Sequence, residues 1–101
     1  MIKAYIAGQI SGKEGYKKDF GEAAARLEER GFAVLNPAVL PEGMRKRDYA
    51  RICFSMVDTA DIIYLLPGWE DSPGAQLEKA YAEYAGKGIA FCDVEEEFRE
   101  A

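Results

Sequence analysis

The stretch Asp61-Ile62-Ile63-Tyr64-Leu65-Leu66 gives the strongest strand signal in this chain of 101 residues. It is short, almost wholly apolar, and rich in β-branched and aromatic residues, which is typical of a strand buried on both faces of a sheet. Pro67 and Gly68 end it. Similar apolar runs at residues 2–7, 32–35 and 89–92 predict three further strands.

Helical patterns separate these predicted strands. Apolar residues recur at helical spacing over Tyr16–Arg30, which predicts the first helix. A second helix is predicted over Asp48–Thr59, with Asp48 as its N-cap, and a third over Pro73–Ala85. The tail, Val94–Ala101, is predicted to form a short acidic helix.

Strands and helices therefore alternate along a single domain that spans residues 1–101. Alternation of this kind with right-handed crossovers predicts an α/β fold with a parallel, doubly wound sheet, flavodoxin-like or Rossmann-like, in three α/β/α layers. The natural strand order is 2-1-3-4. Such sheets bind ligands at the carboxyl ends of the strands where the winding reverses, which is between strands one and three. The loops after Ala7 and Leu66 should therefore form the site.

Charge and hydropathy exclude two classes of partner. The formal net charge is −5, and acidic residues crowd the C-terminal end. A nucleic-acid polymer needs a basic face, so we do not expect such a partner. No apolar run reaches the roughly 20 residues that span a bilayer, and no signal peptide is visible. We therefore expect a cytoplasmic protein without a membrane partner.

The residues that commonly bind metals are scarce. The chain has no histidine and two cysteines, Cys53 and Cys92, which do not form a C-x-x-C pair. We therefore expect neither a metal site nor histidine-based catalysis, and no motif calls for a cofactor. One disulfide is arithmetically possible, but each cysteine lies in an apolar run, which favours buried free thiols.

The loop after the first strand is rich in glycine. Gly8, Gln9, Ile10, Ser11 and Gly12 follow that strand directly. Glycines allow backbone N–H groups to approach a ligand closely, and consecutive amides near a helix start favour a phosphate or a carboxylate. The alternative is a strand-to-helix turn that simply requires glycine, and spacing alone does not separate the two.

The loop after the third strand leads into the helix that carries Glu78. A carboxylate there would point back toward the switch point, where it could attack an electrophilic sugar carbon. The alternative is an exposed glutamate favoured near a helix N-terminus by the macrodipole. Tyr5 lies inside the first strand, where a buried phenol needs a partner. That partner is either Glu78 across the switch point or a backbone carbonyl.

Three other features have two interpretations each. Trp69, beside the predicted site, could stack on a base, or it could cover the core or anchor an interface. Asp61 lies at the opposite end of its strand, which favours a turn or cap over catalysis. The basic residues at 45–47 favour a solvated loop over closure on an anionic ligand.

Three segments together resemble the nucleoside 2-deoxyribosyltransferase superfamily. They are the opening at 5–12, the Thr59-Ala60-Asp61 element before the third strand, and the turn at 72–78 that ends in Glu78. The stretch at 65–70 is similar to one in short bacterial and phage members. The resemblance implies that Glu78 attacks the anomeric carbon of the ligand and expels the base, with Tyr5 orienting Glu78. Water or a second base would then take the sugar.

The resemblance also implies the ligand. In the 2'-deoxynucleoside 5'-phosphate N-hydrolase branch the glycine-rich opening holds the phosphate. That branch has a serine six residues before the nucleophile, as Ser72 is here. Ser72 and Gly74 therefore join the expected phosphate-binding residues. A nucleotide, more than a nucleoside, is the implied small-molecule partner.

Two departures keep other functions open. Cys53 stands where characterised members carry an aspartate, and the chain ends soon after Cys92, where those members extend toward a neighbouring subunit. One alternative is a non-catalytic nucleotide-binding module, and a second is a NAD-cleaving domain with a comparable glutamate. Small domains of this kind usually self-associate, so a homo-oligomer is expected.

Overall fold

Each of the four strands predicted from apolar runs is present in the structure, which adds a fifth. The computed structural model describes residues 1–92 and 98–100. Its strands are β1 (Lys3–Ala7), β2 (Ala33–Leu35), β3 (Ile62–Leu65), β4 (Gly88–Cys92) and β5 (Phe98–Glu100). Its helices are α1 (Tyr16–Glu29), α2 (Lys46–Thr59) and α3 (Pro73–Tyr84), with short 3₁₀ turns η1 (Pro37–Val39) and η2 (Trp69–Asp71).

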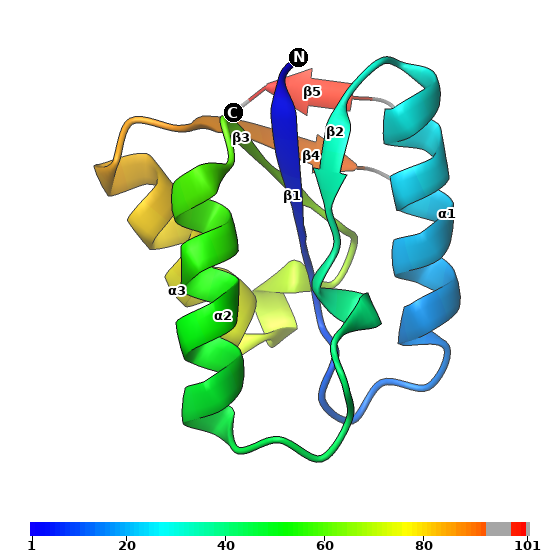
Figure 1. Ribbon diagram of the computed structural model, residues 1–101, viewed down its shortest axis with the longest axis vertical. Coiled ribbons are helices and arrows are strands. Elements are labelled where there is room, and N and C mark those ends of the chain that lie inside the picture. Colours follow the sequence, from blue (N-terminus) through cyan, green and yellow to red (C-terminus); the bar gives the residue numbers. More distant parts are fainter. Residues whose placement is uncertain (93–97, 101) are drawn as a thin grey trace.

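The sheet has the order β2-β1-β3-β4-β5. The first four of these strands are parallel, which confirms the predicted order 2-1-3-4. In Figure 1, α1 covers one face of the sheet, whereas α2 and α3 cover the other, so the three layers are also confirmed. The carboxyl ends of β1 and β3 lie side by side. The Leu66 N–H, directly after β3, donates to the Ala7 carbonyl at the end of β1 at 2.9 Å.

The predicted C-terminal helix is wrong where the structure describes it. Phe98–Glu100 form β5, which pairs antiparallel with β4 through Ala90↔Glu100 and Cys92↔Phe98. The physical reason is that β4 would otherwise present an unpaired edge of N–H and C=O groups. The rest of the predicted helix, residues 94–97 and 101, lies outside the described residues.

The start of α2 also differs from the prediction. Arg45, not Asp48, is the N-cap, and α2 begins at Lys46. Asp48 acts from inside the first turn, because its carboxylate accepts the Arg45 N–H at 3.2 Å. An acidic residue at the third helical position can satisfy a free N–H as well as an N-cap residue can. No described helix combines the length and apolarity that crossing a bilayer requires.

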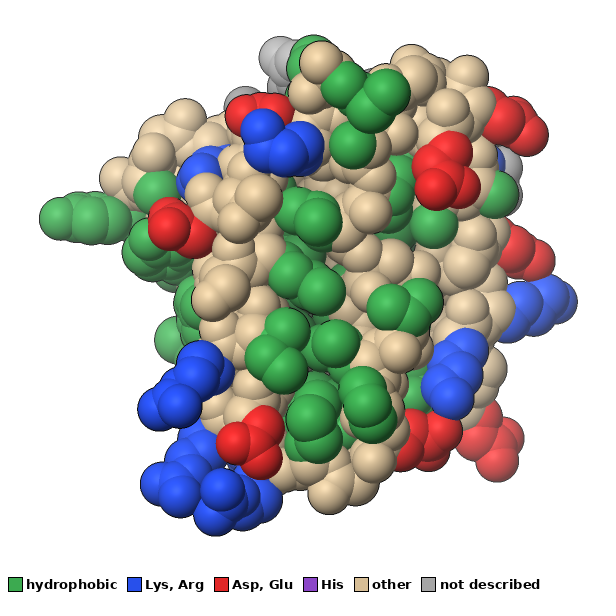
Figure 2. All heavy atoms as spheres, in the orientation of Figure 1, with side chains coloured by type: hydrophobic (Ala, Val, Ile, Leu, Met, Phe, Trp, Pro, Cys, Tyr) green, Lys and Arg blue, Asp and Glu red, His purple; other side chains and the backbone are tan. Residues whose placement is uncertain are grey.

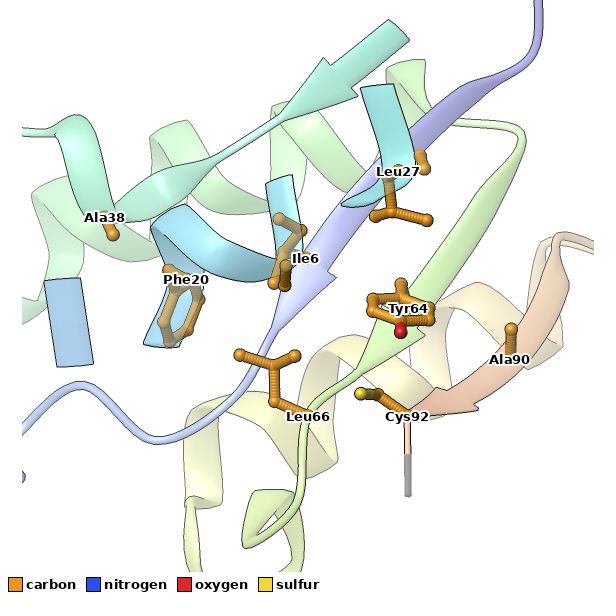
Figure 3. Packing of buried hydrophobic residues seen from close by; sticks show 10 residues of the cluster. Ile6, Phe20, Leu27, Ala38, Tyr64, Leu66, Ala90 and Cys92 are labelled. Carbon is orange, nitrogen blue, oxygen red and sulfur yellow. The ribbon is translucent and has the colours of Figure 1, made fainter. Parts of the chain in front are cut away.

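Alternation along the strands divides the core into two clusters. Ile6 and Tyr64 face α1, where they pack with Phe20 and Leu27 (Figure 3). The neighbouring strand residues point the opposite way, and Tyr5 is among them, in the cluster under α2 and α3. This alternation places the Tyr5 hydroxyl in the layer that also contains Glu78.

The same division settles the state of the cysteines. Cys53 belongs to the cluster under α2 and α3, whereas Cys92 belongs to the cluster under α1. The two thiols are therefore on opposite faces of the sheet, and both are buried and free, as expected.

Candidate active site

Tyr5 and Glu78 meet between the sheet and the α2–α3 layer. Tyr5 is 1% exposed on β1, and Glu78 is 9% exposed on α3. The Tyr5 hydroxyl donates to Glu78 Oε2 at 2.9 Å across 73 positions of sequence. The predicted hydrogen bond is therefore confirmed. The alternatives, an outward-facing glutamate and a tyrosine bonded to a backbone carbonyl, are wrong.

Burial gives this carboxyl group unusual acid–base properties. It raises the pKa of Glu78 from 4.5 to about 7, while the hydrogen bond from Tyr5 acts in the opposite direction. Burial, followed by the nearby charge of Glu78, holds the pKa of Tyr5 well above its ordinary value. Tyr5 therefore keeps its proton at neutral pH, whereas Glu78 exchanges its proton near pH 7. A carboxyl group with such a pKa can serve as a nucleophile or in proton transfer.

A third buried group lies on the same side of the sheet as this pair. Cys53, on α2, is 8% exposed and lies with Tyr5 in the cluster under α2 and α3. Burial raises the pKa of its thiol. No sequence motif indicates that Cys53 lies in the same cluster as Tyr5. The one available signal is that Cys53 precedes Val57 by four residues, and both share the buried face of α2.

The glycines of the first loop have local structural reasons. A Cβ on Gly8 would lie 3.2 Å from the Leu66 Cβ and 3.3 Å from the Phe20 ring, so close packing favours glycine there. Gly12 has a φ of 74°, which an ordinary side chain rarely adopts. Ile10 packs against the cluster under α1, and Gln9 contacts the Ser11 carbonyl at 3.5 Å. The turn alone therefore accounts for the glycines, and phosphate binding by this loop stays a prediction.

Ser72 and Gly74 lie at the start of α3, on the same edge of the sheet. Ser72 is the N-cap of α3, and its hydroxyl accepts the Ala75 N–H at 3.2 Å. Gly74 is exposed. Both residues flank helix N–H groups that have no partner within the helix, which is where an anion is favourably placed.

The N-cap role of Ser72 gives a first prediction. Ser72→Ala should lower the free energy of unfolding by about 1 kcal/mol, because the Ala75 N–H loses its acceptor. Urea denaturation followed by circular dichroism measures the change. An unchanged midpoint would show that water replaces the hydroxyl without cost.

Comparison with known protein families matches residues 2–91 to a domain of unknown function, DUF4406. The chain belongs to the DUF4406 family. A search of curated proteins found no match to it. Among solved structures, this DUF4406 domain is similar to the CMP N-glycosidase BcmB of Clostridium botulinum, with a TM-score of 0.67 and 26% sequence identity. The similarity covers 88% of this chain and 69% of that protein.

These matches can be compared with the resemblance to the nucleoside 2-deoxyribosyltransferase superfamily that the sequence shows. The DUF4406 match and the fold shared with an N-glycosidase support membership of the nucleoside deoxyribosyltransferase-like superfamily. The sheet order 2-1-3-4 with its flanking helices is the fold held in common. The finer likeness to one branch of that superfamily stays a prediction.

Trp69 of the DUF4406 domain has neighbours within its own chain. Its ring lies 5.9 Å from the Phe91 ring at a tilt of 41°, and Lys79 Nζ lies 5.5 Å from its centroid. The ring thus covers part of the cluster under α2 and α3. Stacking on a base stays a prediction.

Asp61 has the simpler of its two expected roles, whereas closure of residues 45–47 on an anionic ligand stays a prediction. Asp61 accepts the Lys3 N–H at 2.8 Å and pairs with Lys3 Nζ at 3.3 Å, far from Glu78 at the amino end of the sheet. Residues 45–47 are exposed at the start of α2, where Figure 2 shows Lys and Arg side chains gathered at the surface. Within the described part of the DUF4406 domain, no group of acidic and cysteine side chains could hold a metal ion.

The Tyr5–Glu78 contact gives a second prediction. Tyr5→Phe should raise the pKa of Glu78 further above about 7, because the carboxylate loses the donor that favours its charged form. Carbon-13 NMR of protein labelled at the glutamate carboxyl carbons measures this pKa. Tyr84→Phe is the matched control, since Tyr84 is 89% exposed. A Glu78 pKa that is the same in both variants would contradict the prediction.

Proposed function

We propose that this DUF4406 domain cleaves or transfers at the N-glycosidic bond of a nucleotide or nucleoside, with Glu78 as the nucleophile. The observation that supports this most is the buried Glu78 carboxyl, fixed by the Tyr5 hydroxyl at 2.9 Å beside the switch point of the sheet. The similarity to a CMP N-glycosidase supports the same chemistry.

The proposed reaction has two steps. The ionised Glu78 carboxylate attacks the anomeric carbon of the sugar, the bond from that carbon to the base nitrogen breaks, and the base leaves with its electron pair. Water then attacks the glycosyl ester, which releases the sugar and restores the carboxylate. A second base in place of water gives transfer instead of hydrolysis. Tyr5 holds the Glu78 carboxylate in one orientation by its hydrogen bond to Oε2.

The proposed ligand is a nucleotide whose phosphate lies at the carboxyl edge of the sheet. The candidate contacts are backbone N–H groups of residues 8–12 together with Ser72 and Gly74 at the start of α3. Helix and turn amides bind phosphate without a basic side chain. A phosphate site built from backbone amides is therefore compatible with the chain's net charge of −5.

Base release tests the proposal. The protein is incubated at pH 8 with CMP, the four deoxynucleoside 5'-monophosphates and NAD, and free base is measured by liquid chromatography. The proposal predicts base release from at least one monophosphate. A thermal shift without product would instead favour a nucleotide-binding module. Nicotinamide release from NAD alone would favour a NAD-cleaving domain.

A further inference from the structure

The outer side of α3 carries a strip of apolar side chains at the surface. Leu77 is 61% exposed and Tyr84 is 89% exposed, and Ala80 and Tyr81 lie between them and are also exposed. Steps of three and four residues place all four on one side of the helix. In Figure 2, hydrophobic side chains project from the side of the molecule on which α3 lies. A contiguous exposed apolar strip of this kind marks an interaction site, whereas single exposed residues do not.

One side of α2 borders this strip. The Phe54 ring lies 5.9 Å from the Tyr81 ring, edge to face, and the Tyr81 hydroxyl donates to Asp58 Oδ1 at 2.8 Å. Phe54 and Asp58 therefore face α3. Arg47 and Arg51 continue the same side of α2 toward its start, because positions 47, 51, 54 and 58 recur at helical spacing.

The bordering side of α2 is basic at one end and acidic at the other. Arg47 and Arg51 lie in its first half and are exposed, whereas Asp58 lies near its end. Among the described residues, no carboxylate pairs with either arginine. Lys87 Nζ donates to the main-chain carbonyl of Asp58 and not to its carboxylate. A surface with this polarity is complementary to a copy of itself turned end to end.

We propose that a second copy of this chain binds here, with α3 packed antiparallel on α3 across a two-fold axis. The midpoint between Leu77 and Tyr84 falls between Ala80 and Tyr81. An axis at that point places Leu77 of each copy against Tyr84 of the other. The small Ala80 side chain at the centre allows the two helices to approach closely.

The same axis accounts for the charges on α2. Both helices run in the same direction, because each connects two parallel strands. Turning one copy end to end therefore brings Arg51 of each copy toward Asp58 of the other, and the contact is made twice. This interface gives the homo-oligomer expected from the sequence a defined face. It involves neither the Tyr5 hydroxyl nor the buried Glu78 carboxyl, so it does not depend on the proposed function.

Sedimentation velocity over a concentration series that reaches the millimolar range tests the face. We expect the wild type to form a dimer. Leu77→Lys and Tyr84→Lys should each raise the dimer dissociation constant at least about 100-fold, because each places two charges near the centre of the interface. Circular dichroism checks that both variants are folded.

Val39→Lys is the matched control, since Val39 is 76% exposed on η1, away from α3. It should dimerise as the wild type does. A wild type that stays monomeric at millimolar concentration would overturn the proposal. So would dimers of Leu77→Lys and Tyr84→Lys as tight as those of Val39→Lys, because the copies would then meet through another face.

Charge reversal tests the antiparallel arrangement. Arg51→Asp and Asp58→Arg each set like charges against one another twice, so each should raise the dissociation constant at least about tenfold. An equimolar mixture of the two variants should recover the wild-type affinity, because the mixed dimer has opposite charges at both contacts. A mixture that dissociates as readily as either variant alone would overturn the proposal.

Discussion

Glu78→Gln is expected to lower the rate of base release at least about 10³-fold, because an amide cannot form the glycosyl ester. The amide oxygen can still accept the Tyr5 proton, so the contact at 2.9 Å and the packing around it are retained. Initial rates at saturating nucleotide, measured for wild type and variant at pH 8, give the comparison.

Glu83→Gln is the control for this loss. Glu83 lies on the same helix, is exposed, and pairs with Lys79 at 3.0 Å. Its variant should release base at the wild-type rate. Comparable rates in Glu78→Gln and wild type would remove Glu78 from the mechanism.

The same substitution is expected to stabilise the fold above neutral pH. The pKa of Glu78 is raised from 4.5 to about 7 in the folded chain, so folding carries a free-energy cost wherever the carboxyl must ionise in the interior. The cost is absent below about pH 4.5, grows as the pH rises to about 7, and stays constant above that. It amounts to about 3 kcal/mol. Glu78→Gln removes it, because the amide stays neutral.

Urea denaturation at several pH values measures this effect. The free energy of unfolding of Glu78→Gln should equal that of wild type near pH 4 and exceed it by about 3 kcal/mol at pH 8. Taking the difference between the two proteins at each pH cancels the titration of all other groups. A difference that does not vary with pH would contradict the buried, proton-exchanging carboxyl. Loss of activity together with a gain in stability is the signature of a residue selected for reaction rather than for folding.

The fold was predictable because its signals are local and repeated. The apolar run at 61–66 and its three counterparts gave the strands, and the helices between them gave the order 2-1-3-4. The β5 pairing was missed because a three-residue edge strand, Phe98–Glu100, leaves no periodic pattern. What favours it is the unpaired edge of β4, which is a property of the assembled sheet.

The contact between Tyr5 and Glu78 was predictable from the sequence, but the residues around it were not. Tyr5 has a polar tip inside an apolar strand, and Glu78 lies on the helix after the switch point, so each requires a partner that the topology supplies. Cys53 gave no such signal, because a cysteine on an apolar helix face is ordinary core. Only the assembled fold shows that Cys53 shares the cluster under α2 and α3 with Tyr5. The glycines of the first loop turned out to have packing and turn reasons of their own.

A single-turnover reaction with peptide mass mapping tests the central claim most directly. Protein in excess over a cleavable nucleoside monophosphate is quenched in acid within milliseconds to seconds at pH 8, digested, and examined for a sugar phosphate adduct. The adduct is expected to form on Glu78 as the base is released, and Glu78→Gln is expected to form none. Base release with no adduct at Glu78 at any time, or with an adduct on another residue, would contradict it.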